Sequence, residues 1–112
     1  MLKASHKTAS VELDKIPLLP GTADAINSGI ESTLAPDNRH IECLIGVSGT
    51  HHSTPEYRVL FDPQTSGGLL LGVPPTLAKK FEEEVLATGA GTAIAIGKVT
   101  DAPKSEPLLQ TV

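Results

Sequence analysis

Apolar and polar residues alternate in one short stretch near the amino terminus. In residues 9–14 (ASVELD), Val11 and Leu13 are separated by polar neighbours. This period of two predicts a strand with one buried face. Four further stretches have the composition of strands: 40–47, 69–73, 92–99 and, as a short edge strand, 108–112. Because Leu69–Val73 (LLLGV) is continuously apolar, we expect it to form a central strand that is buried on both faces.

Two other stretches show the spacing of amphipathic helices. Thr22 is a suitable N-cap for the first, and Gly89 supplies the end of the second, which opens at Pro75. The apolar positions of the first are Ala23, Ile26 and Ile30, and those of the second are Leu77, Phe81 and Val85. Since such a face must be covered, we expect both helices to pack on the sheet.

The predicted order is strand, helix, strand, strand, helix, strand, which is typical of an α+β fold with a mixed, partly antiparallel sheet and packed helices. Residues 57–61 (YRVLF) fit either a short helix or a strand, and the pattern does not decide between them. The length suits one hydrophobic core, so we expect a single domain over residues 1–112. Residues 101–107 are expected to form a solvated linker before the final strand.

Composition narrows the classes of partner. Aromatic residues make up only 3% of the chain, so we expect an aliphatic core. The formal net charge is −4, from 9 basic and 13 acidic residues. A negative chain with few aromatic side chains offers neither attraction to phosphates nor a surface on which bases stack. Nucleic acid is therefore not an expected partner.

Cysteine usage and apolar run lengths bear on the compartment. Cys43 is the single cysteine, which excludes an internal disulfide and is typical of a reducing environment. The longest apolar runs have about five residues, whereas a membrane helix needs about 20. The first residues, MLKASHKTASVELD, lack the apolar core of a secretion signal. We expect a cytoplasmic protein with no membrane contact.

The stretch 61–74 (FDPQTSGGLLLGVP) carries the most unusual local chemistry. Its glycines lead into a strand and no lysine follows them, so it is not a nucleotide phosphate-binding loop. Gln64 stands where a nucleophile elbow requires glycine, so Ser66 is not expected to be a nucleophile. The sequence alone predicts no catalytic residue here.

Two interpretations of this stretch remain open. It is either a tight turn in which Asp62 accepts hydrogen bonds from backbone N–H groups, or the edge of a binding site. Gly67 and Gly68 permit a positive φ and the close approach of a ligand or another backbone segment. Turn residues are usually only turns, which favours the first interpretation.

Three histidines and the cysteine form a cluster of potential metal ligands in the sequence. His40 and Cys43 are three residues apart, and His51 and His52 follow within thirteen positions. A structural zinc site needs a second well-spaced pair, and adjacent histidines on a strand point to opposite faces. We expect no metal site, and we expect residues 48–55 to form a mobile surface loop.

The stretch LFDPQTSGGLLLGVP, followed by a helix and by AIAIGKV, resembles the carboxy-terminal part of selenophosphate synthetase (selenide, water dikinase). The similarity extends more loosely back through VELDKIPLLPG and GIESTLAPDN, so it covers most of the chain. It implies the fold of the carboxy-terminal domain of the aminoimidazole ribonucleotide synthetase superfamily. It also implies a parent enzyme that converts ATP, selenide and water to selenophosphate, AMP and phosphate in the presence of Mg²⁺.

The family's catalytic cysteine or selenocysteine, its lysine and its metal-binding aspartates belong to segments that have no match in this sequence. Asp14, Asp24 and Asp62 do not occupy those positions. The resemblance therefore implies a carboxy-terminal fragment that is inactive alone and holds no cofactor or metal. Its partner would be the missing amino-terminal ATP-binding domain of the same chain, in a homodimeric parent.

The resemblance also implies a loop that faces the cleft between the two domains of the parent. Its residues are Asp62, Gln64, Thr65, Ser66, Gly67 and Gly68. A different class of function stays open beside this one, namely a stand-alone α+β module that binds a small ligand or partner without catalysis. Another synthetase of the same superfamily is a weaker third alternative.

Overall fold

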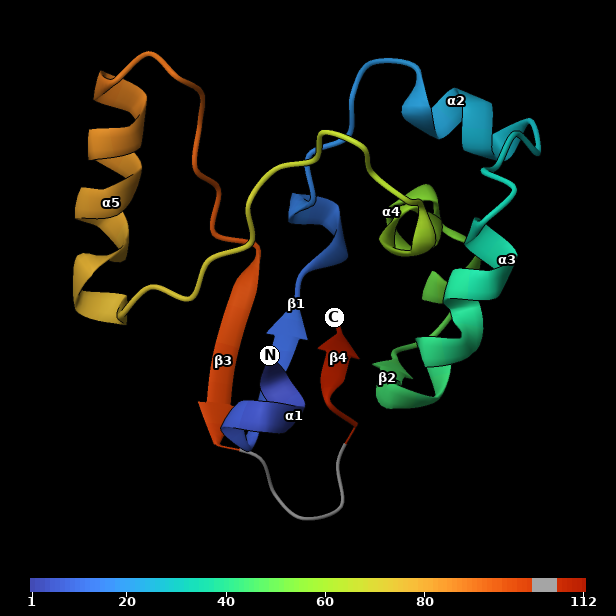
Figure 1. Ribbon diagram of the computed structural model, residues 1–112, viewed down its shortest axis with the longest axis horizontal. Coiled ribbons are helices and arrows are strands. Elements are labelled where there is room, and N and C mark those ends of the chain that lie inside the picture. Colours follow the sequence, from blue (N-terminus) through green and yellow to red (C-terminus); the bar gives the residue numbers. More distant parts are fainter. Residues whose placement is uncertain (102–106) are drawn as a thin grey trace.

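A four-stranded sheet forms the centre of the molecule (Figure 1). The computed structural model describes residues 1–101 and 107–112, so most of the predicted linker 101–107 lies outside the described residues. The strands are β1 (Lys7–Val11), β2 (Ile45–Val47), β3 (Gly97–Asp101) and β4 (Leu109–Thr111). Their order is β2-β4-β1-β3; β3 pairs antiparallel with β1, while β4 runs parallel to both β1 and β2. The mixed sheet confirms the predicted α+β class.

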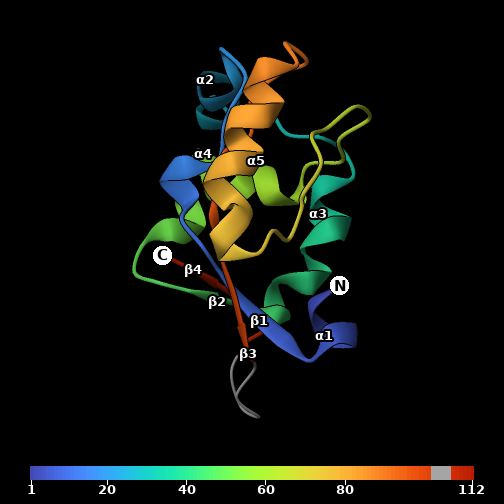
Figure 2. The same cartoon turned by 90° about the vertical axis from the view of Figure 1, so that its left-hand side faces the viewer.

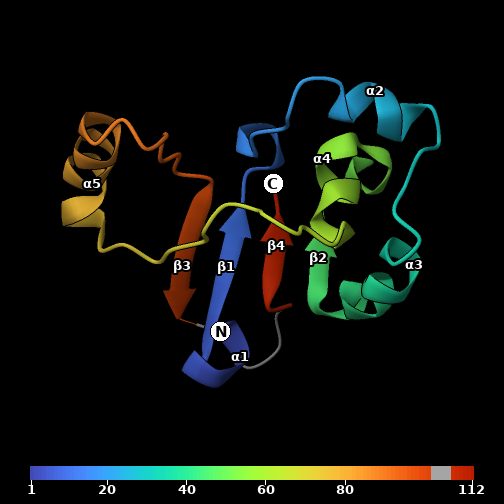
Figure 3. The ribbon, with the colours of Figure 1, turned by 45° about the horizontal axis from the view of Figure 1, so that its top comes forward.

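Most helices lie on the β2 side of the sheet, and one lies on the opposite side (Figures 1 and 3). The α-helices are α1 (Leu2–Ser5), α2 (Thr22–Asn27), α3 (Ala35–Asn38), α4 (Pro55–Arg58) and α5 (Pro75–Ala87). The 3₁₀ turns are η1 (Leu13–Lys15), η2 (Arg39–Leu44), η3 (His51–Ser53) and η4 (Val59–Phe61). Residues 57–61, which the sequence left undecided, are therefore helical.

The core lies between the β2 side of the sheet and the turns that follow it. Leu13, Tyr57 and Phe61 are its buried centre. The partly buried residues that pack against them are Ile16, Ile45, Val47 and Leu60. The expectation of a purely aliphatic core is wrong, because the rings of Tyr57 and Phe61 meet edge to face at 5.3 Å between centroids. Two aromatic side chains placed together dominate a core of this size.

The last strand, β4, is internal rather than at an edge, which corrects the prediction for 108–112. Ala9 donates its N–H to the carbonyl of Leu108 at 3.0 Å, and Val112 donates to the carbonyl of Val11 at 2.9 Å. On its other side β4 pairs with β2. Thr111 is fully buried as a result. Periodicity reveals a strand but not which neighbours it has, so this position could not be predicted.

The other strands are shorter than predicted or displaced along the chain. The strand predicted at 9–14 runs from Lys7 to Val11, because Leu13–Lys15 turn into a 3₁₀ helix. Of the stretch 40–47 only Ile45–Val47 is a strand, and the part before it is 3₁₀ helix. The strand predicted at 92–99 begins only at Gly97.

The central strand predicted at Leu69–Val73 is wrong. These residues have no regular secondary structure, and Leu69 is 89% exposed. The position beside β1 that a buried strand would need is filled by β4. A continuous apolar run indicates that a segment favours burial, but it forms a strand only where a partner strand is free.

Both predicted helices exist, with differences at their ends and faces. The first starts at Thr22 itself, with Gly21 (φ +85°) as its N-cap; Ile26 is buried but Ile30 is exposed. The second, α5, spans Pro75–Ala87 and ends before Gly89 as predicted. It does not pack on the sheet but stands beyond β3, where Figure 2 shows it in front of the strands. Phe81 on it is half-buried.

Candidate functional site

The stretch 61–74 leaves the core at Phe61, which neighbouring side chains hold in place. Phe61, at the end of η4, is 1% exposed, and its carbonyl accepts a 2.8 Å hydrogen bond from Asn38 Nδ2. The Arg39 guanidinium lies 5.2 Å from the centre of the Phe61 ring. Asp62 donates its N–H to the carbonyl of Val59 at 3.1 Å and then continues in an extended conformation. The loop thus has a rigid origin, while residues 63–68 are exposed.

Within the loop, Gln64 folds back over its neighbours. Its Nε2 donates to Asp62 Oδ2 at 2.7 Å. The Asp62 carboxylate is thus held by a side-chain amide, which corrects the expectation of backbone donors. A Cβ at Gly67 would lie 2.9 Å from Cβ of Gln64, a separation that requires one of the two to move. A glycine is therefore needed at position 67 because Gln64 approaches it closely. Its φ is not positive, so a positive φ is not the reason for glycine here.

The structure brings together only part of the predicted loop set. Gln64 binds Asp62 and lies where a Cβ at Gly67 would be, whereas a Cβ at Gly68 would meet nothing within 4 Å. Thr65 and Ser66 are exposed. Whether any of these residues faces a substrate stays a prediction.

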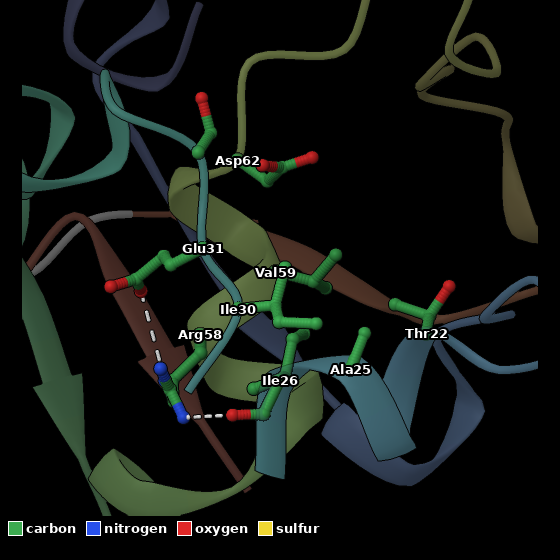
Figure 4. Close-up of a pocket in the computed structure, with 9 residues that line it drawn as sticks. Thr22, Ala25, Ile26, Ile30, Glu31, Arg58, Val59 and Asp62 are labelled. Carbon is green, nitrogen blue, oxygen red and sulfur yellow. Dashed lines mark hydrogen bonds and ion pairs between the residues drawn. The ribbon is translucent and has the colours of Figure 1, made fainter. Parts of the chain in front are cut away.

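A cavity adjoins the start of this loop. It has a volume of about 200 Å³ and lies between α2, residues 30–32 and the segment 58–62. In Figure 4 the side chains of Ile26, Ile30 and Val59 point toward one another as its apolar wall. Asp62 is the one residue that both lines the cavity and belongs to the predicted loop. The cavity is smaller than the pockets of about 300–1,000 Å³ that usually bind small molecules.

A charged pair closes one side of the cavity. Arg58 Nη1 donates to the carbonyl of Ile26 at 2.8 Å, and Arg58 Nε lies 3.7 Å from Glu31 Oε1 (Figure 4). Arg39 also donates to Glu31. The hydrogen bond from Arg39 holds the pKa of the Glu31 carboxyl below its ordinary value, and the charge of Arg58 acts in the same direction. Both guanidinium groups are thus engaged within the protein, and Arg58 is fixed in place as part of the cavity lining.

Sequence reasoning did not find this cavity. Glu31 and Arg58 are distant in the sequence, and each lies in a stretch that reads as irregular or undecided. An ion pair between them depends on α2 packing against α4, which is a tertiary contact with no local signal.

The histidines lie elsewhere and are more ordered than expected. His51–Ser53 form η3, and the His52 ring packs edge-on against Tyr57 at 5.1 Å. The segment lies at the surface, with Gly49, Thr50, His52 and Ser53 exposed, but it is a 3₁₀ turn that this contact ties to the core rather than an irregular loop. Its mobility stays a prediction. Within residues 1–101 and 107–112, no three His, Cys, Asp or Glu side chains are grouped so that they could hold a metal ion.

Comparison with known proteins gives one consistent result. No family model matches the chain. A selenide, water dikinase of Clostridioides difficile (strain 630) is 33% identical over 107 residues, which are 95% of this chain and 30% of that protein. One of Geobacter metallireducens is 34% identical over 100 residues, or 88% of this chain and 28% of the relative. One of Nitratidesulfovibrio vulgaris (strain DP4) is 38% identical over 79 residues, or 69% and 22%.

The chain is a selenide, water dikinase-related domain. This confirms the resemblance seen in the sequence. The domain spans 22–30% of the length of the relatives that it matches. In the part of the chain that the structure describes, no helix has the length and apolar character to cross a membrane.

Proposed function

We propose that this chain is the carboxy-terminal part of a selenophosphate synthetase, an enzyme that forms selenophosphate, AMP and phosphate from ATP, selenide and water. The observation that carries this proposal is the alignment, which covers nearly the whole chain but under a third of the Clostridioides difficile relative. A shared segment of this extent supports a contribution to the relatives' reaction. The reducing cytoplasm is the proposed compartment, in keeping with the single free Cys43.

In this proposal ATP and Mg²⁺ are held by the rest of the parent enzyme, its amino-terminal ATP-binding domain. The described residues give no grouping of three potential metal ligands, which supports placing the ion in the rest of the parent. Phosphoryl transfer requires metal ions to neutralise charge and groups that position the nucleophile. The chain's own contribution is then structural: a loop of fixed origin at Phe61 that presents Asp62–Gly68 to the rest of the enzyme.

A chimeric enzyme tests the proposal. The aligned segment of the Clostridioides difficile selenide, water dikinase would be replaced by these 112 residues, and AMP formation would be measured with ATP, Mg²⁺ and selenide. We expect selenide-dependent AMP formation, with the segment-deleted enzyme as the inactive control. A chimera that melts cooperatively yet forms no AMP would support the stand-alone binding module instead.

A further inference from the structure

The cavity beside α2 is built from segments that hold one another in place. Its most buried lining residue is Ile26, which is 8% exposed and whose carbonyl accepts the hydrogen bond from Arg58. Val59 lines the cavity from η4, which ends at the buried ring of Phe61. Ile30 is 67% exposed, so the cavity opens to solvent on the side of this residue. The folded chain thus offers an open cavity with fixed walls.

The size of the cavity limits the class of ligand. Its volume is about 200 Å³. An apolar cavity of about 150 Å³ is large enough to hold a molecule of the size of benzene. A ligand of about six to eight heavy atoms therefore fits this cavity, whereas a nucleotide does not. Since Ala25, Ile26 and Val59 offer aliphatic walls, the apolar part of such a ligand is a short alkyl chain.

The unbalanced charge of the lining is negative. Glu31 is neutralised by its contacts with Arg39 and Arg58. Within residues 1–101 and 107–112, Asp62 takes part in no ion pair, and its one hydrogen-bonded carboxylate oxygen is Oδ2, which accepts from Gln64. In Figure 4 the Asp62 carboxylate points away from the pair of Glu31 and Arg58. Its second oxygen is therefore available to a donor that enters the cavity.

The other polar groups of the lining suit the same kind of donor. Thr22 and Ser32 contribute hydroxyl groups. Hydroxyl and carboxylate oxygens both accept hydrogen bonds from an ammonium group, and the bond to the carboxylate is strengthened because both partners are charged. A negative ligand would instead be repelled by Asp62, and a neutral one would leave the charge of this carboxylate without a partner.

We propose that this cavity binds a small aliphatic primary ammonium ion. The alkyl chain lies against Ala25, Ile26 and Val59, and the ammonium group donates to the carboxylate of Asp62. The site consists of described residues of this chain alone, so it does not depend on the proposed synthetase function.

Titration of the ¹⁵N-labelled chain with isopentylammonium at neutral pH tests the site by NMR. We expect saturable shifts of the backbone signals of Ala25, Ile26, Val59 and Asp62, with a dissociation constant of about 1 mM because so small a ligand makes few contacts. Isopentanol has the same alkyl chain without the charge and should bind at least about tenfold more weakly. Isovalerate, with a negative charge on a similar chain, should bind more weakly still.

The order of the three probes decides the outcome. Binding of isovalerate or isopentanol as tight as that of isopentylammonium would overturn the proposal, because the Asp62 carboxylate would then contribute nothing to recognition. The absence of a saturable shift with isopentylammonium would overturn it as well.

Removal of a single carboxylate charge tests the role of Asp62. Asp62→Asn should weaken the binding of isopentylammonium by at least about tenfold and change that of isopentanol by less than about twofold. Since isopentanol contacts only the apolar walls, its unchanged binding shows that the cavity is intact in the variant. Asp24→Asn is the matched control, because Asp24 is an exposed carboxylate on α2 outside the cavity lining. Equal dissociation constants for isopentylammonium in the two variants would contradict recognition by Asp62.

Discussion

Gly67 and Gly68 are neighbours in the sequence but have different surroundings. A side chain at Gly67 would collide with Gln64, while one at Gly68 would meet open space. The sequence predicted a special loop here but gave both glycines the same role. The two glycines differ because Gln64 folds back onto Asp62 and so lies close to Gly67. That contact depends on the path of the loop and could not be predicted from composition.

Substitution of the two glycines therefore tests the loop. In the chimeric enzyme, Gly67→Val should lower kcat/KM for selenide-dependent AMP formation by at least about tenfold, or about 1.4 kcal/mol of transition-state stabilisation. The cause is displacement of Gln64 and Asp62. Gly68→Val is the control and should change kcat/KM less than about twofold. Melting temperatures of both variants should match the unaltered chimera, since the loop is exposed. Equal activities for the two variants would reduce the stretch to an ordinary turn.

Glu31 should make the stability of the domain sensitive to acid. Its folded pKa lies below the ordinary value of 4.5, so the carboxylate stabilises the fold above that pH and loses this effect as the pH falls through the folded pKa. The melting temperature of Glu31→Gln should thus lie below that of the unaltered chain at neutral pH, and the difference should shrink below pH 4.5.

Glu83→Gln is the matched control for this measurement. Glu83 lies 3.9 Å from Lys79 in an exposed ion pair, which contributes little to stability at any pH. A difference between Glu31→Gln and the unaltered chain that stays constant from neutral to acid pH would show that the Arg39 contact does not depend on the charge of Glu31.

At the scale of elements, features that depend on neighbouring residues were predicted correctly, whereas strand pairing was not. The helix α5 was predicted with nearly correct ends because Pro75, the apolar spacing and Gly89 all act within one stretch of chain. The strands depend on distant partners: β4 took the place beside β1 that the sequence assigned to Leu69–Val73. An apolar run indicates that a segment favours burial. It does not indicate which of two such segments will pair in the sheet, because that depends on both of them.

The two phenylalanines provide a test of this arrangement. Phe61→Ala should destabilise the domain by roughly 3–5 kcal/mol, because its ring is almost fully buried. Phe81→Ala should cost only about 1 kcal/mol, because α5 stands apart from the core and its ring is half-buried. Both free energies follow from urea unfolding monitored by circular dichroism. Equal losses would mean that α5 packs on the core in solution.

At the scale of the whole molecule, the α+β class was predictable, and so was the relation to selenide, water dikinases. The cavity beside Asp62 and the place of β3 at the end of the strand order were not. Both features depend on which segments far apart in the chain come together. The pattern of apolar and polar residues does not indicate such contacts.

The isolated chain should not turn over ATP. Incubated with ATP, Mg²⁺ and selenide, it should yield no AMP above the blank, because the described residues supply no grouped metal ligands for phosphoryl transfer. The intact Clostridioides difficile relative serves as the positive control in the same assay. Selenide-dependent AMP formation by the 112 residues alone would show that the chain holds a complete catalytic centre.

The place of β4 has a consequence for how the protein is made. On the ribosome β1 and β2 emerge long before β4, yet among residues 1–101 and 107–112 β2 has no strand partner other than β4. Until that strand is synthesised, β1 and β3 can pair but Ile45–Val47 have no strand beside them. During synthesis the middle third of the nascent chain therefore lacks a completed sheet. In this period its unpaired strands can aggregate or bind chaperones.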